Sequence, residues 1–165
     1  VDERGERRHP IILHNSPSGA IERCIYALLE KAHYLQEKGE VPKLPLWLSP
    51  TQVRIIPVTR DHIPKAMDLA EFFEKSQVRV DLDDREETVQ KKIRDAEREW
   101  IRYILVFGER EASSKQLQVR DREARAIRSL TSRELVDEVL GETKGKPFLS
   151  LPLPRMLSQR PLFVS

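Results

Sequence analysis

The chain has 165 residues, of which 34% are charged and 39% apolar, and its formal net charge is +2. This composition is typical of one globular domain, or of a small domain with a piece of another, and no run approaches the twenty apolar residues of a membrane span. A single cysteine excludes an internal disulfide and a cysteine-based zinc cage, and the polar start VDERGERRHP lacks the apolar core of a signal peptide. We therefore expect a cytoplasmic protein.

The first forty residues predict one strand and one helix. In RHPIILH (8–14), three apolar residues lie between a proline and the turn NSPSG, which favours a short strand. A helix then follows, with Gly39 as its C-cap, because the apolar residues recur at helical spacing. That stripe consists of Ile21, Cys24, Ile25, Leu28, Leu29 and Ala32. A strand and one helix cannot bury a core by themselves, so we expect this part to be the last strand and helix of a larger domain.

After the structure-breaking stretch VPKLPLWLSP, strands and helices alternate. The predicted strands are 52–58, 78–83, 103–108 and 116–122, and the predicted helices are 61–76, 86–99 and 130–141. Asp61 is the expected N-cap of the first helix, and Thr131 or Ser132 that of the last. The order predicts a three-layer α/β domain with a mostly parallel sheet over about 45–145, in which the apolar YILVFG strand is central. The Pro-rich tail is expected to lie extended across a surface.

No catalytic constellation is complete in these residues. The four histidines show no pair at metal-ligand spacing, and there is no glycine-rich dinucleotide loop, Walker loop or serine-nucleophile motif. By chemistry alone the chain resembles a binding module. Arg23 is the exception, since a guanidinium at a helix N-terminus suits a phosphate. The alternative interpretation of Arg23 is a solvent-facing side chain that forms an ion pair with a neighbouring acidic residue.

Several segments together carry a family resemblance. SGAIERCIYALLE resembles motif 3 of the class II aminoacyl-tRNA synthetases, and LPLWLSPTQVRIIPVT resembles the junction with their anticodon-binding domain. The details favour the threonyl-tRNA synthetase family of the archaeal type, because a histidine stands nine residues before the motif 3 arginine. WLSPTQV, KKIRDAE, YILVFGERE and LQVRDRE then match its C-terminal domain in order. The resemblance implies a three-layer α/β/α anticodon-binding domain with a five-stranded mixed sheet, preceded by the last strand and helix of the catalytic domain.

The resemblance also implies roles in an active site. Arg23 matches the arginine that contacts the ATP phosphates during adenylate formation, where a fixed cationic donor is needed. Gly19 and Ser18 belong to the same nucleotide site, Gly19 because it lets backbone approach the nucleotide closely. His14 matches the third ligand of a zinc ion that binds the amino and hydroxyl groups of threonine, and thereby rejects valine. ATP with Mg²⁺ and Zn²⁺ are thus the cofactors of the complete enzyme, and none is expected on this piece.

Four further residues match positions that face tRNA. Glu111 and Arg120 match readers of anticodon bases, Arg94 matches another tRNA-facing position, and Glu86 matches one weakly because the preceding loop differs in length. A carboxylate can accept from guanine N–H groups while an arginine donates to base carbonyls. The alternative for Glu111 and Arg120 is a surface ion pair. The charge run 83–99 is expected to be mostly a solvated helix face.

The family pattern is incomplete in this sequence, because motifs 1 and 2 and the other two zinc ligands are missing from it. We therefore expect a remnant of the catalytic domain (1–40), the anticodon-binding domain (41–145) and an extension (146–165). The parent would ligate threonine to tRNA(Thr) and would dimerise through upstream regions, whereas this piece alone should not aminoacylate. Two alternatives stay open: another synthetase of the subclass, prolyl or histidyl, or a non-catalytic protein that uses the domain to bind RNA or a subunit.

Overall fold

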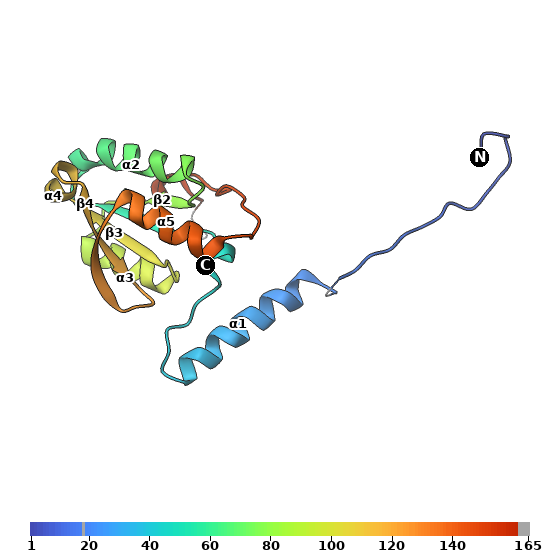
Figure 1. Cartoon of the computed structure of the whole chain (residues 1–165), viewed down its shortest axis with the longest axis horizontal. Helices are drawn as coiled ribbons and strands as arrows, with labels where there is room; N and C mark the ends of the chain where they lie inside the picture. The colour runs from blue at the N-terminus through green and yellow to red at the C-terminus, as the bar shows by residue number, and fades with distance from the viewer. Residues whose placement is uncertain (18, 162–165) are drawn as a thin grey trace.

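A computed structural model describes residues 1–17 and 19–161. Within these residues the central element is a five-stranded sheet with the strand order β2-β1-β3-β4-β5 (Figure 1). The strands are β1 (Val53–Pro57), β2 (Val80–Leu82), β3 (Tyr103–Phe107), β4 (Gln116–Asp121) and β5 (Ala126–Thr131). β1 is parallel to β2 and β3, whereas β4 is antiparallel to β3 and β5. The sheet is mixed, as the resemblance implied. The prediction of a mostly parallel sheet is wrong, because the last two strands form a hairpin.

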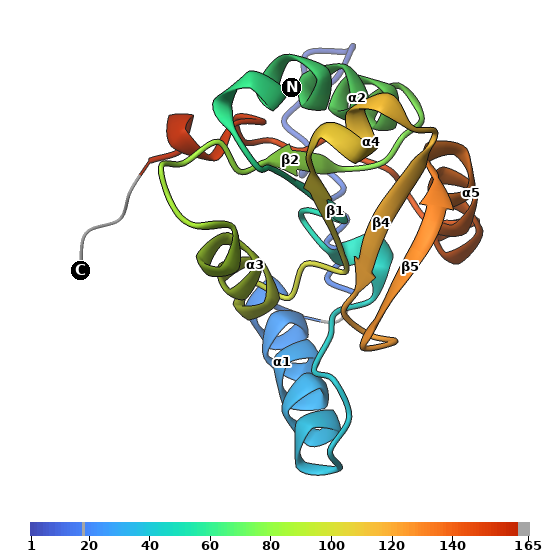
Figure 2. The same cartoon turned by 90° about the vertical axis from the view of Figure 1, so that its left-hand side faces the viewer.

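Helices cover both faces of the sheet and make three layers. α2 (Ile63–Lys75) and α5 (Ser132–Thr143) pack on one face, and α3 (Val89–Arg98) packs on the other (Figure 2). A short helix, α4 (Glu109–Ser113), follows β3. The three-layer prediction is confirmed, and β3 is the middle strand, as its apolar sequence indicated. Among the described helices, none is long and apolar enough to cross a membrane.

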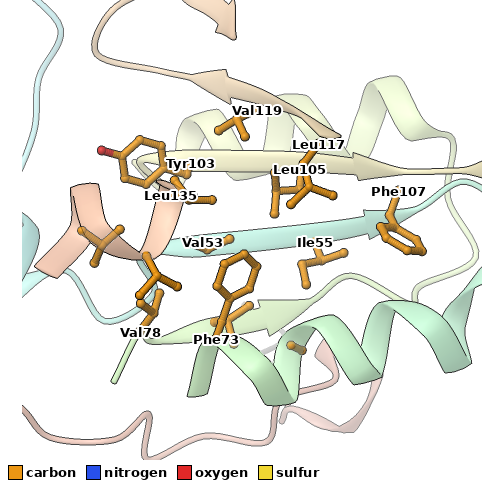
Figure 3. Packing of buried hydrophobic residues seen from close by; sticks show 14 of the residues in the cluster. Val53, Ile55, Phe73, Val78, Tyr103, Leu105, Phe107, Leu117, Val119 and Leu135 are labelled. Carbon is orange, nitrogen blue, oxygen red and sulfur yellow. The ribbon is translucent and has the colours of Figure 1, made fainter. Parts of the chain in front are cut away.

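The core follows from the alternation of side chains along the strands. Val53 and Ile55 of β1 point to the face that α2 and α5 cover, where they meet Phe73 (Figure 3). Ile56 points to the other face, toward α3. That smaller cluster consists of Ile56, Ala96, Ile101 and Ile104, with Val89 and Ile93 packed against it. One strand therefore supplies apolar side chains to both layers of the core.

A buried ion-pair network joins β1, β2 and the end of α3. Arg54 is only 1% exposed. Its Nε lies 2.8 Å from Asp81 Oδ1, and its Nη2 lies 2.7 Å from Glu99 Oε2. The hydroxyl of Thr51 donates to Asp81 Oδ2 at 3.0 Å. Burial opposes the charge of Arg54, but the two carboxylates outweigh it and raise the pKa of the guanidinium above its ordinary value.

The starts of two helices test the predicted caps. α5 begins with a capping box, in which Thr131 Oγ1 accepts from the Glu134 N–H at 3.2 Å and the Glu134 carboxylate accepts from the Thr131 N–H at 2.7 Å. The first of its two predicted caps is therefore the one used. The prediction of Asp61 as N-cap of α2 is wrong, because Asp61 lies within a 3₁₀ turn (Arg60–His62) and the α-helix begins at Ile63.

The hairpin of β4 and β5 was not predicted beyond its first strand. Its turn is built by Asp121, whose Oδ1 accepts the backbone N–H groups of Glu123 and Ala124 at 3.0 Å each. Arg125 then adopts a positive φ of 53°. β5 lies at the edge of the sheet and its Ile127 is 59% exposed, so its sequence lacks the clear apolar alternation that reveals a strand.

The N-terminal part contains α1 (Ile21–Glu37), which extends away from the sheet in Figure 1. The C-cap of the helix is Lys38 and not Gly39 as predicted; Gly39 follows it with a φ of 78°, and its N–H donates to the Gln36 carbonyl. Most of the apolar stripe is exposed, Ile21 by 75%, and only Ala32 is buried. The strand predicted at 8–14 is wrong: these residues are exposed and unpaired, because no other described segment offers them a partner strand.

The C-terminal tail follows the free edge of β2 and lies extended, as predicted. The N–H of Leu82 donates to the carbonyl of Arg155 at 3.0 Å, and Leu82 forms a parallel bridge with Met156. A 3₁₀ turn (Leu157–Gln159) follows, with Leu157 buried. The tail thus covers an edge whose backbone groups would otherwise be free to pair with another chain.

The charged contacts of α5 predict a loss of stability in acid. Glu138 accepts from Arg128 Nη2 at 2.7 Å and from the Tyr103 hydroxyl at 2.8 Å, and these bonds hold the pKa of its carboxyl below the ordinary value. Since the lowered pKa belongs to the folded state, its contribution to stability is present at neutral pH and is lost as pH falls below about 4.3. The free energy of unfolding, measured with urea between pH 7 and 3, should therefore fall less steeply with pH for Glu138→Gln than for the wild type. The same pH dependence in both proteins would contradict this.

Candidate nucleic-acid interface

A cavity of about 450 Å³ lies at the carboxyl end of the parallel strands. β1 and β2 both end at this edge, and the loops that leave them form the walls. In open α/β sheets this is the edge at which ligands bind. The lining residues are Pro57, Val58, Thr59, Arg60, Ile63, Asp84, Arg85, Glu86, Glu87, Thr88 and Lys92.

The β2–α3 loop, residues 83–88, is held by cations on its inner side. Lys92 is 5% exposed, and its Nζ donates to the carbonyl of Asp83 at 3.0 Å. Arg85 donates to both oxygens of the Asp83 carboxylate, at 2.8 and 2.7 Å. Burial raises the pKa of Asp83, but Arg85 outweighs this and the pKa stays below its ordinary value. The expectation of a solvated charge run is therefore wrong for Asp83 and Lys92, which are buried.

Glu86 lies at the mouth of this cavity. Its carboxylate forms an ion pair with Arg60, which comes from the loop after β1, and both side chains are exposed. The pair joins two walls of the cavity. An exposed ion pair of this kind contributes little to stability, so a ligand can exchange for either partner at low cost.

Glu111 lies beside the same cavity, in α4. Its Oε2 accepts the backbone N–H of Gly108 at 3.1 Å, which stabilises the start of that short helix. Gly108 packs closely on the cavity wall, since a Cβ there would lie 3.3 Å from Val58 Cγ2. Glu111 forms no ion pair with Arg120 or with any other described residue. One carboxylate oxygen of Glu111 thus accepts a hydrogen bond that stabilises the helix start, and the residue is half-buried.

Arg120 and Arg94 lie together on the α3 side of the sheet. Arg120 Nη1 lies 3.2 Å from Glu97 Oε1, and both side chains are 41% exposed. Arg94 is exposed and stands one turn before Glu97 on α3, so the three are neighbours. Arg120 pairs with Ile104, three residues before the end of β3, which places it about 10 Å below the carboxyl edge. Of the four predicted RNA-facing residues, Glu86 therefore lines the cavity, whereas Arg120 lies against Glu97 on the α3 face of the sheet.

The residues predicted for a nucleotide and zinc site lie far from these, in the N-terminal part. Gly19 has a φ of 74°, and a Cβ there would lie 4.0 Å from Arg23 Nη1. Arg23 and His14 are exposed, as expected. Ser18 lies outside the described residues. In the described part no group of three His, Cys, Asp or Glu side chains could hold a metal ion, so these residues alone do not make a zinc site.

Local sequence patterns place two buried charged residues near the cavity, although neither was among the predicted site residues. Lys92 lies three residues after Val89 and four before Ala96, so helical spacing places it on the buried face of α3. Asp81 alternates with Val80 and Leu82 in β2, which places it on the opposite face from them. No local pattern indicated Arg60, because its importance depends on the loop it meets across the cavity.

Comparison with known proteins places this geometry in a family. A family described as "Anticodon binding domain" matches residues 52–142, and the chain belongs to that family. The chain is 52% identical to a threonine–tRNA ligase of Nitrosopumilus maritimus and 49% identical to one of Pyrococcus furiosus, each over 98% of this chain and 26% of the relative. It thus spans about a quarter of the length of the curated relatives it matches. The resemblance to threonyl-tRNA synthetases, archaeal ones included, is confirmed.

Two solved structures share the fold. One is the RNA binding domain of threonyl-tRNA synthetase from Cryptosporidium parvum Iowa II, with a TM-score of 0.57, 28% identity, and coverage of 66% of this chain and 26% of that chain. The other is prolyl-tRNA synthetase from Cryptosporidium parvum with L-proline and AMP, with a TM-score of 0.55, 23% identity, and coverage of 61% and 22%. The second likeness concerns the fold alone.

Proposed function

We propose that this chain is the anticodon-reading part of a threonine–tRNA ligase, whose whole protein uses ATP to join threonine to tRNA(Thr). The observation that carries the proposal is the family match over residues 52–142. That range contains the sheet, the cavity and all four candidate RNA-facing residues. The curated threonine–tRNA ligases that match nearly the whole chain at about half identity support the choice of amino acid.

The geometry suits single-stranded RNA. Glu86 at the cavity mouth and Glu111 beside it offer carboxylate oxygens to base N–H groups, and Arg120 offers donors to base carbonyls. The cavity volume is in the range of small-ligand pockets, so it can admit an unstacked base. Arg94 is exposed and has no ion-pair partner among the described residues, which supports a role in neutralising a phosphate.

The same proposal assigns the rest of the chain. Residues 1–40 would be the end of a class II catalytic domain, 41–145 the anticodon-binding domain and 146–165 an extension, in a cytoplasmic homodimer joined through other parts of the protein. Arg23, with Gly19 and Ser18, would contact ATP and its Mg²⁺, and His14 would contribute one zinc ligand. Since the described residues do not form a zinc site by themselves, His14 would need further ligands from outside them.

The test is binding of an anticodon stem-loop to this chain, with the affinity measured by calorimetry or fluorescence anisotropy. A stem-loop with a threonine anticodon should bind about 10- to 100-fold more tightly than one with altered second and third bases, since each well-formed base contact is worth about 1–3 kcal/mol. Affinity should fall as salt rises. Equal affinities for the two stem-loops would defeat the proposal.

The alternative of a prolyl or histidyl enzyme has weaker support. The prolyl structure shares the fold at 23% identity, whereas the curated relatives at about half identity are threonine–tRNA ligases. An aminoacylation assay on the whole parent protein, with threonine, proline and histidine each supplied, distinguishes these candidates. A non-catalytic RNA-binding protein would charge none of them.

A further inference from the structure

The C-terminal tail holds the outer side of the β2–α3 loop. The backbone N–H of Ser158 donates to Asp84 Oδ1 at 2.9 Å, and the Ser158 hydroxyl donates to the other oxygen of the same carboxylate. Asp84 lines the cavity. One tail residue therefore binds a residue of the cavity wall through two hydrogen bonds.

A second tail residue is anchored at the root of the same loop. Arg160 Nη2 lies 3.0 Å from Oδ2 of the fully buried Asp81. Arg160 Nε donates to the carbonyl of Pro154 at 2.9 Å, which folds the tail back on itself. Asp81 belongs to β2, two residues before the loop begins. Arg160 thus ties the tail to the rigid strand from which the loop departs.

The loop is consequently clamped from two sides. On the inner side, Lys92 binds the carbonyl of Asp83 and Arg85 binds its carboxylate. On the outer side the tail contacts the loop through Asp84. The exposed ion pair between Glu86 and Arg60 adds a weaker link to the opposite wall of the cavity. The inner bonds hold the beginning of the loop, whereas Glu86 lies further along it. The position of Glu86 at the cavity mouth therefore depends on both clamps.

We propose that Ser158 and Arg160 are positioning residues for the β2–α3 loop, and that through this loop they set the RNA affinity of the cavity. The inference rests on the proposed function. It names tail residues, remote in sequence from the sheet, as contributors to anticodon recognition. They act through Asp84 and Asp81, and the RNA-facing group that they position is Glu86.

The test compares Ser158→Ala/Arg160→Gln with Arg155→Gln. The control removes a tail ion pair of the same kind, between Arg155 and Glu74 of α2, which does not touch the loop. Hydrogen exchange should become about tenfold faster in residues 83–88 of the double variant, because losing a local restraint raises local opening. Its affinity for the cognate stem-loop should fall about tenfold. The ratio of its affinities for the cognate and the altered stem-loop should also become smaller. Arg155→Gln should change neither property.

Ser158→Thr keeps a hydroxyl and should keep wild-type loop exchange, while Ser158→Ala alone should show part of the effect even if the double variant fails to fold. Unchanged exchange and affinity in folded Ser158→Ala, or equal effects from Arg155→Gln, would overturn the proposal. If the wild type itself fails to discriminate the two stem-loops, the proposed function fails. The exchange measurement then still reports whether the tail positions the loop.

Discussion

Asp81→Ala is expected to lower the free energy of unfolding by about 3–5 kcal/mol, the largest loss of stability that we expect from a single substitution. Asp81 is fully buried and accepts two bonds from Arg54, one from Thr51 and an ion pair from Arg160. Its removal leaves the guanidinium of Arg54 buried with only Glu99 to balance it. Urea unfolding followed by circular dichroism measures the change, and a loss below about 1 kcal/mol would show that water or Glu99 replaces the pair.

The double variant Arg54→Met/Asp81→Leu is the matched control. Replacing a buried ion pair by apolar side chains of similar size is often neutral, because neither charge then has to be desolvated. We therefore expect the double variant to recover most of the stability that Asp81→Ala loses. A double variant as unstable as the single one would attribute the loss to the contacts of Asp81 with Thr51 and Arg160, and not to the unpaired Arg54.

Arg120→Ala is expected to weaken binding of the cognate stem-loop by about 10- to 100-fold, equivalent to about 1–3 kcal/mol. The guanidinium is partly exposed on β4 and can turn from Glu97 toward a base. Its effect on folding should stay below about 1 kcal/mol, because ion pairs this exposed contribute little to stability. Stem-loop titration and urea unfolding of the same sample measure both quantities. An unchanged affinity would assign Arg120 to a surface ion pair.

Glu97→Gln separates those two roles. It breaks the same ion pair but keeps Arg120, which is then free to bind RNA. If Arg120 contacts RNA, Glu97→Gln should bind the stem-loop at least as tightly as the wild type. If the two variants weaken binding equally, the ion pair itself is what matters, and Arg120 acts only by holding α3 against β4.

The sheet and its helices were predictable wherever one local pattern was strong. YILVF is apolar throughout, and it is the middle strand with helices on both faces. The Thr131–Glu134 capping box follows from two residues three positions apart. The pattern failed for β5, whose exposed edge position leaves Ile127 without an apolar partner face, and for 8–14, where apolar residues alone cannot make a strand without a neighbour to pair with.

By itself, the sequence determined the family, four of the five strands, the three longer helices of the sheet domain and the cap of α5, because each depends on residues a few positions apart. Only the tertiary structure decided which of the charged residues act together. It placed Arg120 against Glu97, clamped the β2–α3 loop with Ser158, and buried Arg54 with Asp81. These contacts join residues far apart in the chain, so they depend on strand order and register, which no local period encodes.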